Sequence, residues 1–294
     1  MSVPLPDSFR YQQIDADGVR INCAVAGDGP PLLLLHGYPQ THLIWHHVAP
    51  VLADAYTVVL TDLRGYGDSA KPAPGPDDAE YSKRAMARDQ LLVMRALGFE
   101  RFGVAGHDRG ARVGHRLALD HPEAVSALAV LDIVPTRHTF EHVNKAFGEA
   151  YFHWFFLAAG NGIPERLIEG DPEFWIRARM SARHEGGEPF DPAAMAEYVR
   201  CFSDPAAIAA SCSDYRAAAS IDLEHDNMTA TLTCPVLALW GESGFVGRNY
   251  DVAAVWRTYA KEVSAEALPG NHYLPEEQPA RTASALREFF AARR

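Results

Sequence analysis

The clearest chemical signal in the sequence is an aspartate between two glycines, in Gly106-His107-Asp108-Arg109-Gly110. The residues before it, GVAG, are typical of a buried strand, and those after it, ARVGHRLAL, have helical periodicity. A sharp turn of the form glycine-x-nucleophile-x-glycine between a strand and a helix projects its central side chain into a site. Because a carboxylate is already ionised at neutral pH, Asp108 can displace a leaving group from a saturated carbon without a base.

Displacement by Asp108 would leave an ester, and hydrolysis of that ester needs a base to activate water. His272, in GNHYLPEE, lies between the last predicted strand and the last predicted helix. This position completes the chain order nucleophile, acid, histidine. Two acids are candidates for orienting His272, namely Asp132 in VLDIVP and Glu242 after PVLALWG.

Two arginines stand beside the predicted nucleophile. Arg109 and Arg112 are three residues apart at the start of a helix, so they project from neighbouring positions and add to the positive potential of the helix N-terminus. The chain has 27 Lys and Arg against 38 Asp and Glu, a formal net charge of −11. A local pair of cations in an acidic protein predicts a substrate that carries a carboxylate.

Short apolar runs alternate with helical patterns on both sides of the middle of the chain, which predicts a mostly parallel sheet flanked by helices, an α/β fold. The expected strands are INCAVAG, PLLLLHG, YTVVLTD, FGVAG, VSALAVLDIV, PVLALWG and a run before Pro269. Expected helices lie at about 82–97, from Arg109, at 252–259 and at 276–292.

Between the two halves the pattern is helical only, in segments starting at about residues 139, 171, 191 and 205. We interpret residues 136–231 as an all-helical cap domain inserted into a core domain of residues 1–135 and 232–294. A cap above the strand ends is a common place for a buried small-molecule site.

Two glycine-bearing loops follow predicted strands upstream of Asp108. His36-Gly37-Tyr38-Pro39 stands where a backbone N–H would complete an oxyanion hole. The second loop contains Gly65-x-Gly67-x-x-Ala70, but Lys71-Pro72 follows where a phosphate-binding helix would begin. A dinucleotide site is therefore not expected there.

The motifs HGYPQT, DLRGYGDS, GHDRGAR and GNHYLPEE together resemble the α/β-hydrolase superfamily, and GHDRGAR is similar to the fluoroacetate dehalogenases. The resemblance implies that Asp108 is the nucleophile, His272 the base and Asp132 the orienting acid in preference to Glu242. It further implies a substrate-binding set consisting of Arg109 and Arg112 for the carboxylate, Tyr38 for the oxyanion, and His153, Trp154 and Tyr215 for the departing halide. The reaction would convert a short haloacid, such as fluoroacetate or chloroacetate, to glycolate and halide.

Three alternatives use the same fold. An epoxide hydrolase shares the Asp and His but normally has an aromatic residue in place of Arg109, with two cap tyrosines, and a haloalkane dehalogenase acts on neutral substrates and lacks the arginine pair. A catalytically inactive relative that binds a small ligand is disfavoured by the intact Asp108, Asp132 and His272.

Composition limits the partners. The negative charge argues against nucleic acid and anionic membranes, and the absence of a targeting or membrane-spanning run predicts a cytoplasmic protein. Cys23, Cys201, Cys212 and Cys234 are scattered and are expected to be reduced thiols. His42 and His46 have a spacing that could bind a metal, but no third ligand is evident, so no metal and no cofactor is expected. The resemblance suggests a homodimer.

Overall fold

The computed structural model of the protein describes residues 5–181, 189–226 and 231–293. Its centre is an eight-stranded sheet with the order β1-β2-β4-β3-β5-β6-β7-β8. The strands are β1 (Arg10–Ala16), β2 (Val19–Ala26), β3 (Pro31–Leu35), β4 (Thr57–Thr61), β5 (Phe102–His107), β6 (Val125–Leu131), β7 (Val236–Gly241) and β8 (Val263–Leu268). The expected α/β fold is confirmed, and strands from both halves of the chain share one sheet.

The six strands β3 to β8 run parallel, and β1 and β2 pair antiparallel at one edge. Strands β3 and β5 are almost entirely buried, as expected for parallel strands covered on both faces. Strand β1 was not predicted, because Arg10–Ala16 is an exposed edge strand with no apolar alternation. The carboxyl ends of the parallel strands meet at one edge of the sheet, where residues 36, 108, 132 and 242 follow β3, β5, β6 and β7.

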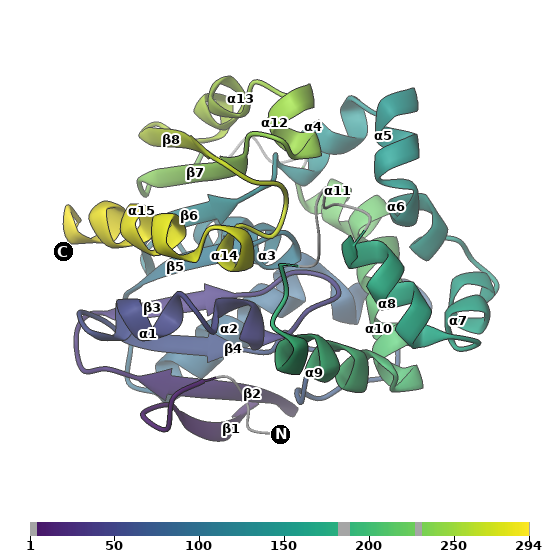
Figure 1. Cartoon of the computed structure of the whole chain (residues 1–294), viewed down its shortest axis with the longest axis horizontal. Coiled ribbons are helices and arrows are strands. Elements are labelled where there is room, and N and C mark those ends of the chain that lie inside the picture. Colours follow the sequence, from purple (N-terminus) through teal and green to yellow (C-terminus); the bar gives the residue numbers. More distant parts are fainter. Residues whose placement is uncertain (1–4, 182–188, 227–230, 294) are drawn as a thin grey trace.

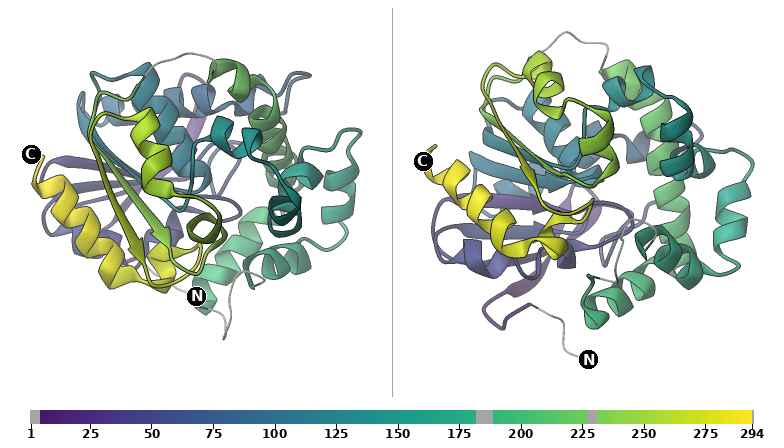
Figure 2. Two further views of the ribbon diagram at one scale, coloured as in Figure 1. Left: turned by 90° about the horizontal axis from the view of Figure 1, so that it is seen from above. Right: turned by 45° about the horizontal axis from the view of Figure 1, so that its top comes forward.

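Helices cover the sheet on both sides (Figures 1 and 2). Helices α2 (Lys83–Ala96) and α3 (Arg109–Asp120) pack together, and α1 (Ala49–Ala53) packs on α15 (Pro279–Ala291). Helix α13 (Val252–Tyr259) begins and ends as predicted. The predicted closing helix at 276–292 is instead two helices, α14 (Leu274–Glu277) and α15, because Gln278, with φ −135° and ψ 52°, is not helical and Pro279 starts a new helix. Short helices η1 (His42–Trp45), η2 (Ala79–Tyr81) and α12 (Phe245–Asn249) complete this part.

Every described element between β6 and β7 is a helix. These are α4 (Thr136–Glu141), α5 (Lys145–Ala150), α6 (Phe152–Leu157), α7 (Ile163–Ile168), α8 (Pro172–Ser181), α9 (Pro192–Phe202), α10 (Pro205–Ala219) and α11 (Ile221–His225). Figures 1 and 2 show α5 to α10 gathered beside one end of the sheet. The predicted helical segment from residue 139 covers the end of α4 and all of α5 and α6. The end of the segment from residue 171 lies outside the described residues. Within the described part of the chain, no helix has both the length and the hydropathy of a membrane span.

Candidate active site

Asp108 occupies a strained turn between β5 and α3. Its backbone angles, φ 46° and ψ −115°, lie outside the regions that residues other than glycine normally adopt. A Cβ on Gly106 would lie 2.5 Å from the backbone nitrogen of Ala111, and one on Gly110 would lie 2.3 Å from the carbonyl oxygen of His36. Both glycines are therefore required for the strand, the helix and the loop after β3 to approach this closely. The turn holds Asp108 at the carboxyl end of the sheet, with 7% of its surface exposed.

The loop after β3 lies against the Asp108 carboxylate. The backbone N–H of Tyr38 donates a hydrogen bond to Asp108 Oδ2 at 3.2 Å. Gly37 permits this contact, because a Cβ there would lie 2.5 Å from Cβ of Asp108. The geometry is that of an oxyanion-hole donor aimed at one carboxylate oxygen of the turn residue.

Asp132 and His272 form a buried pair. His272 Nδ1 lies 2.6 Å from Asp132 Oδ2, and the backbone N–H of Gly241 donates to Asp132 Oδ1 at 3.1 Å. Since a carboxylate accepts, Nδ1 carries the proton and Nε2 is the basic nitrogen. Glu242, the other candidate acid, has an exposed side chain. The structure thus brings Asp132 to His272 and leaves Glu242 outside the site.

Arg109 has a buried carboxylate partner that the sequence analysis did not identify. Its Nε donates to Asp214 Oδ2 at 3.0 Å, and its Nη2 donates to the other oxygen and to the Asp214 carbonyl at 2.7 Å. Lys83 also pairs with this carboxylate, and Tyr66 donates its hydroxyl to it at 2.7 Å. These cations hold the pKa of Asp214 well below its usual range, despite the opposing effect of complete burial. The only clue in the sequence was that Asp214 precedes Tyr215 in the cap.

Arg112, in contrast, is held by neutral oxygens. Its Nη1 donates to the Val134 carbonyl at 3.1 Å and to the Thr136 hydroxyl at 3.0 Å. Its guanidinium carbon lies 4.7 Å from the centroid of the Trp154 ring. Burial lowers the pKa of Arg112 to about 10, so the side chain is cationic at neutral pH.

The aromatic cap residues predicted from the sequence lie together. The ring of Tyr215 is 5.7 Å from that of His153 and 5.8 Å from that of Trp154, and the Arg109 guanidinium is 4.2 Å from the Tyr215 ring centroid. Arg179 Nη2 is 3.0 Å from His153 Nδ1. Because a guanidinium only donates, Nδ1 accepts and the proton of neutral His153 is on Nε2.

A small pocket of about 20 Å³ brings together five of the predicted site residues, Asp108, Arg112, Asp132, Trp154 and His272, whereas Tyr38, Arg109, His153 and Tyr215 are not among its lining residues. Such a volume holds a water molecule or a very small ligand. The lining includes both core and cap residues: Asp108, Arg112, Asp132, Val134, Thr139, Phe147, Tyr151, Trp154, Phe245, Val246, Tyr250 and His272. The sequence analysis missed Tyr151, Phe245 and Tyr250, whose apolar rings carry no signal that separates a pocket wall from ordinary packing.

Three buried N–H groups here have no hydrogen-bond partner among the described residues. They are Arg109 Nη1, Arg112 Nε and the Trp154 indole nitrogen. A buried donor without a partner loses its hydration without compensation, and donors such as Trp45 Nε1, Gln90 Nε2 and Arg116 Nε share this state elsewhere in the described chain. The donors of Arg112 and Trp154 differ because both residues line the pocket with Asp108, and this shared position favours a ligand with acceptor atoms.

Other groups singled out by the sequence have structural partners. His42 Nδ1 lies 2.8 Å from Asp62, and His46 Nδ1 lies 2.7 Å from the Leu43 carbonyl. Cys23, Cys201, Cys212 and Cys234 are free, buried thiols, as expected.

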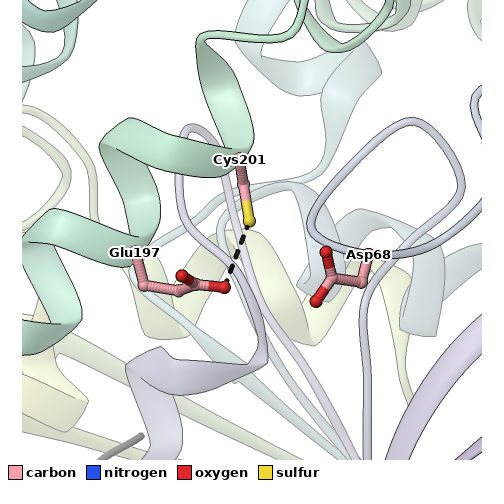
Figure 3. Close-up of side chains that lie close together, drawn as sticks. All are labelled: Asp68, Glu197 and Cys201. Carbon is pink, nitrogen blue, oxygen red and sulfur yellow. Dashed lines mark hydrogen bonds between the residues drawn. The ribbon is translucent and has the colours of Figure 1, made fainter. Parts of the chain in front are cut away.

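A cluster outside the pocket has the residue types of a metal site. Asp68, Glu197 and Cys201 lie close enough together to hold an ion (Figure 3). Arg200 Nη2 donates to all three side chains, which accounts for the cluster without an ion.

Strand order, the glycine-flanked turn at Asp108 and the Asp132–His272 pair define an α/β hydrolase. The model of the α/β hydrolase fold family matches residues 30–277, and the protein belongs to this family. It is similar to fluoroacetate dehalogenase of Burkholderia sp, with 46% identity over 97% of this chain and 95% of that protein. Soluble epoxide hydrolase of Corynebacterium sp. (strain C12) is 34% identical over 96% of this chain and 97% of its own length. The crystal structure of an α/β hydrolase from Nostoc sp PCC 7120 has a TM-score of 0.95 and 54% identity, covering 96% of this chain and 98% of that one. The resemblance seen in the motifs is confirmed.

Proposed function

We propose that this hydrolase cleaves the carbon–halogen bond of short 2-haloacids, converting fluoroacetate or chloroacetate to glycolate and halide. The observation that carries the proposal is the pair of buried donors without partners, on Arg112 and Trp154, which line the pocket with Asp108. Arg109, the residue after Asp108, has a third such donor at Nη1. A haloacid supplies acceptors for them at its carboxylate and at its departing halide. The similarity to a fluoroacetate dehalogenase adds independent support.

In the first step, an oxygen of Asp108 attacks the carbon that bears the halogen. The carbon–halogen bond breaks, the halide leaves with the electron pair, and an ester forms between Asp108 and the acid. Tyr38 N–H already occupies Oδ2, so Oδ1 is the attacking atom in this proposal. His153, Trp154 and Tyr215 stabilise the halide, whose negative charge develops as it leaves.

In the second step, water attacks Cγ of the Asp108 ester. His272 Nε2 accepts the proton of that water, and the charge on the resulting imidazolium is stabilised by Asp132 at 2.6 Å. The oxyanion that forms on the Asp108 carbonyl is stabilised by the N–H groups of Tyr38 and Arg109. Collapse releases glycolate, which takes up the proton held by His272. The second proton of the attacking water remains on the new Asp108 carboxyl group, and its loss to solvent restores the Asp108 carboxylate.

We assign the substrate carboxylate to the two arginines, with Arg112 as the principal partner and Nη1 of Arg109 as a further donor.

We also propose that residues 136–231 form the cap that closes this site, and that the protein is a cytoplasmic homodimer. Gel filtration with light scattering tests the dimer directly.

The deciding experiment is release of fluoride and chloride from the matching haloacetates by purified protein. A single turnover in heavy-oxygen water with excess enzyme should then label Asp108 before it labels glycolate. Absence of halide release from fluoro-, chloro- and bromoacetate would exclude the proposed activity. Label that enters glycolate directly would exclude the ester.

Epoxide hydrolysis is the second candidate. Two cap tyrosines are present, since Tyr151 lines the pocket and Tyr215 contacts the Arg109 guanidinium, and a soluble epoxide hydrolase is 34% identical. Ring opening by Asp108 would give the same type of ester. Faster turnover of a neutral epoxide such as styrene oxide than of chloroacetate would favour this candidate.

A further inference from the structure

Tyr38 belongs to the loop after β3, but its ring lies among residues of the inserted helices. The ring stacks on His153 at a centroid distance of 6.3 Å and an interplanar angle of 14°. It makes edge contacts with Phe202 at 5.8 Å and Tyr215 at 5.3 Å. The residue whose N–H faces Asp108 is therefore 3% exposed and enclosed by α6, α9 and α10.

The hydroxyl of Tyr38 has a specific partner in helix α8. The indole Nε1 of Trp175 donates a hydrogen bond to it at 2.5 Å. Trp175 is half-buried and packs on Phe156 with ring centroids 5.1 Å apart. Burial raises the pKa of the Tyr38 hydroxyl well above its usual value, so this hydroxyl is neutral and depends on hydrogen bonds for its buried oxygen.

The same loop has a second attachment two residues later. Gln40 Nε2 donates to Glu276 Oε2 at 2.6 Å, and Tyr198 of α9 donates to Glu276 Oε1 at 2.9 Å. All three side chains are buried. The loop that bears the Tyr38 N–H is thus held at Tyr38 by Trp175 of α8, and at Gln40 by Glu276 of α14, which Tyr198 of α9 also contacts.

We propose that Trp175 is a positioning residue, which fixes the Tyr38 N–H against the Asp108 carboxylate through the Tyr38 hydroxyl. This inference rests on the ester intermediate of the proposed function. Trp175 is absent from the residues lining the pocket, and it acts through Tyr38. The inserted helices therefore contribute to the oxyanion hole as well as covering the site.

The two chemical steps depend differently on this N–H. Negative charge accumulates on the Asp108 carbonyl oxygen only when water attacks the ester, whereas displacement of halide consumes the charge of Asp108. A shift of the Tyr38 N–H away from Asp108 should therefore slow ester hydrolysis more than ester formation. Since complete removal of an oxyanion-hole donor costs roughly 100- to 1,000-fold, a displaced donor should cost about tenfold.

The test compares Trp175→Phe, which keeps an aromatic ring but loses the N–H, with Tyr38→Phe, which loses the acceptor. Rapid-quench measurement of halide release and intact-mass measurement of the Asp108 ester separate the steps. Each variant should hydrolyse the ester about tenfold more slowly, with ester formation changed less than threefold, so the ester fraction at steady state rises. The double variant should be no slower than either single variant, because both remove one interaction.

Phe156→Leu is the matched control, since it loosens packing on the Trp175 ring but keeps the N–H, and its ester fraction should equal that of the wild type. Equal slowing of both steps in Trp175→Phe, or additive effects in the double variant, would overturn the inference while leaving dehalogenation intact. If the wild type opens epoxides instead, an ester of the same type forms on Asp108, and intact-mass measurement of its formation and decay replaces halide release in the same comparison. A wild type that turns over neither substrate refutes the proposed function, and the role of Trp175 with it.

Discussion

Arg109 and Asp214 form a completely buried ion pair, in which Arg109 Nε donates to Asp214 Oδ2 at 3.0 Å. The positive charge of Arg109 is therefore compensated within the protein. Arg112 has no carboxylate within ion-pair distance among the residues that the structure describes, and it lines the pocket with Asp108. The two arginines, which lie three residues apart in the sequence, therefore have different electrostatic roles.

We expect Arg112→Met to impair use of a charged substrate selectively. Loss of a charged hydrogen-bonded pair costs about 1.5–3 kcal/mol, so kcat/KM for chloroacetate should fall roughly 10- to 150-fold. The rate with chloroacetamide, which has no carboxylate, should change little. Arg95→Met removes the same charge from an exposed helix face and should affect neither. If the wild-type enzyme had the same kcat/KM for chloroacetamide as for chloroacetate, the assignment of Arg112 to the substrate carboxylate would be wrong.

Asp214→Asn should destabilise the protein. The substitution leaves the buried cations Arg109 and Lys83 without their shared carboxylate, and breaking a buried pair in this way costs about 3–5 kcal/mol. Asp17→Asn breaks an exposed pair with Arg88 and should cost under about 1 kcal/mol. Urea denaturation measures the free energy of unfolding of both variants. A similar decrease in the two would contradict a stabilising role for the buried Arg109–Asp214 pair.

His272→Asn should separate the two chemical steps. Asp108 attacks as a carboxylate without a base, so displacement remains possible while water activation is lost. The variant should release about one equivalent of chloride per active site and accumulate a carboxymethyl adduct on Asp108, detectable by intact mass and peptide mapping. A serine-type hydrolase behaves oppositely, because its nucleophile needs the histidine. A folded variant with neither chloride release nor adduct would show that His272 acts before or during displacement.

Glu276 should make stability fall with rising pH. Burial raises its pKa from 4.5 to about 8, so between these values the folded state binds one proton more than the unfolded state. The free energy of unfolding therefore decreases as the pH rises through this range, by about 1.4 kcal/mol per pH unit at most. Glu276→Gln, which keeps the shape without the titration, should lose this component. Urea denaturation at pH 6 and 8 measures this effect. An equal change in the free energy of unfolding between the two pH values in wild type and variant would contradict the assignment.

Much of the fold follows from the sequence because its signals are local. Buried parallel strands such as Pro31–Leu35 appear as short apolar runs. The helix expected at about 82–97 agrees with α2, which begins at Lys83 after a Ser82 cap. The glycines around Asp108 identify the turn, since only glycine permits such close approach there. Strand β1 escaped prediction because it is exposed, and helix α15 was joined to α14 because one residue, Gln278, separates them.

By itself the sequence determined the chemical identities, namely an aspartate at a strand–helix turn, a late histidine and two neighbouring arginines. The tertiary structure decided how they are used. It selected Asp132 over Glu242 by direct contact with His272, gave Arg109 a carboxylate from 105 residues away, and left Arg112 in the pocket. It also joined Trp175 to Tyr38 across 137 positions. Such pairings depend on how distant segments pack against each other. Local residue patterns do not predict that packing, because each partner alone is an ordinary buried side chain.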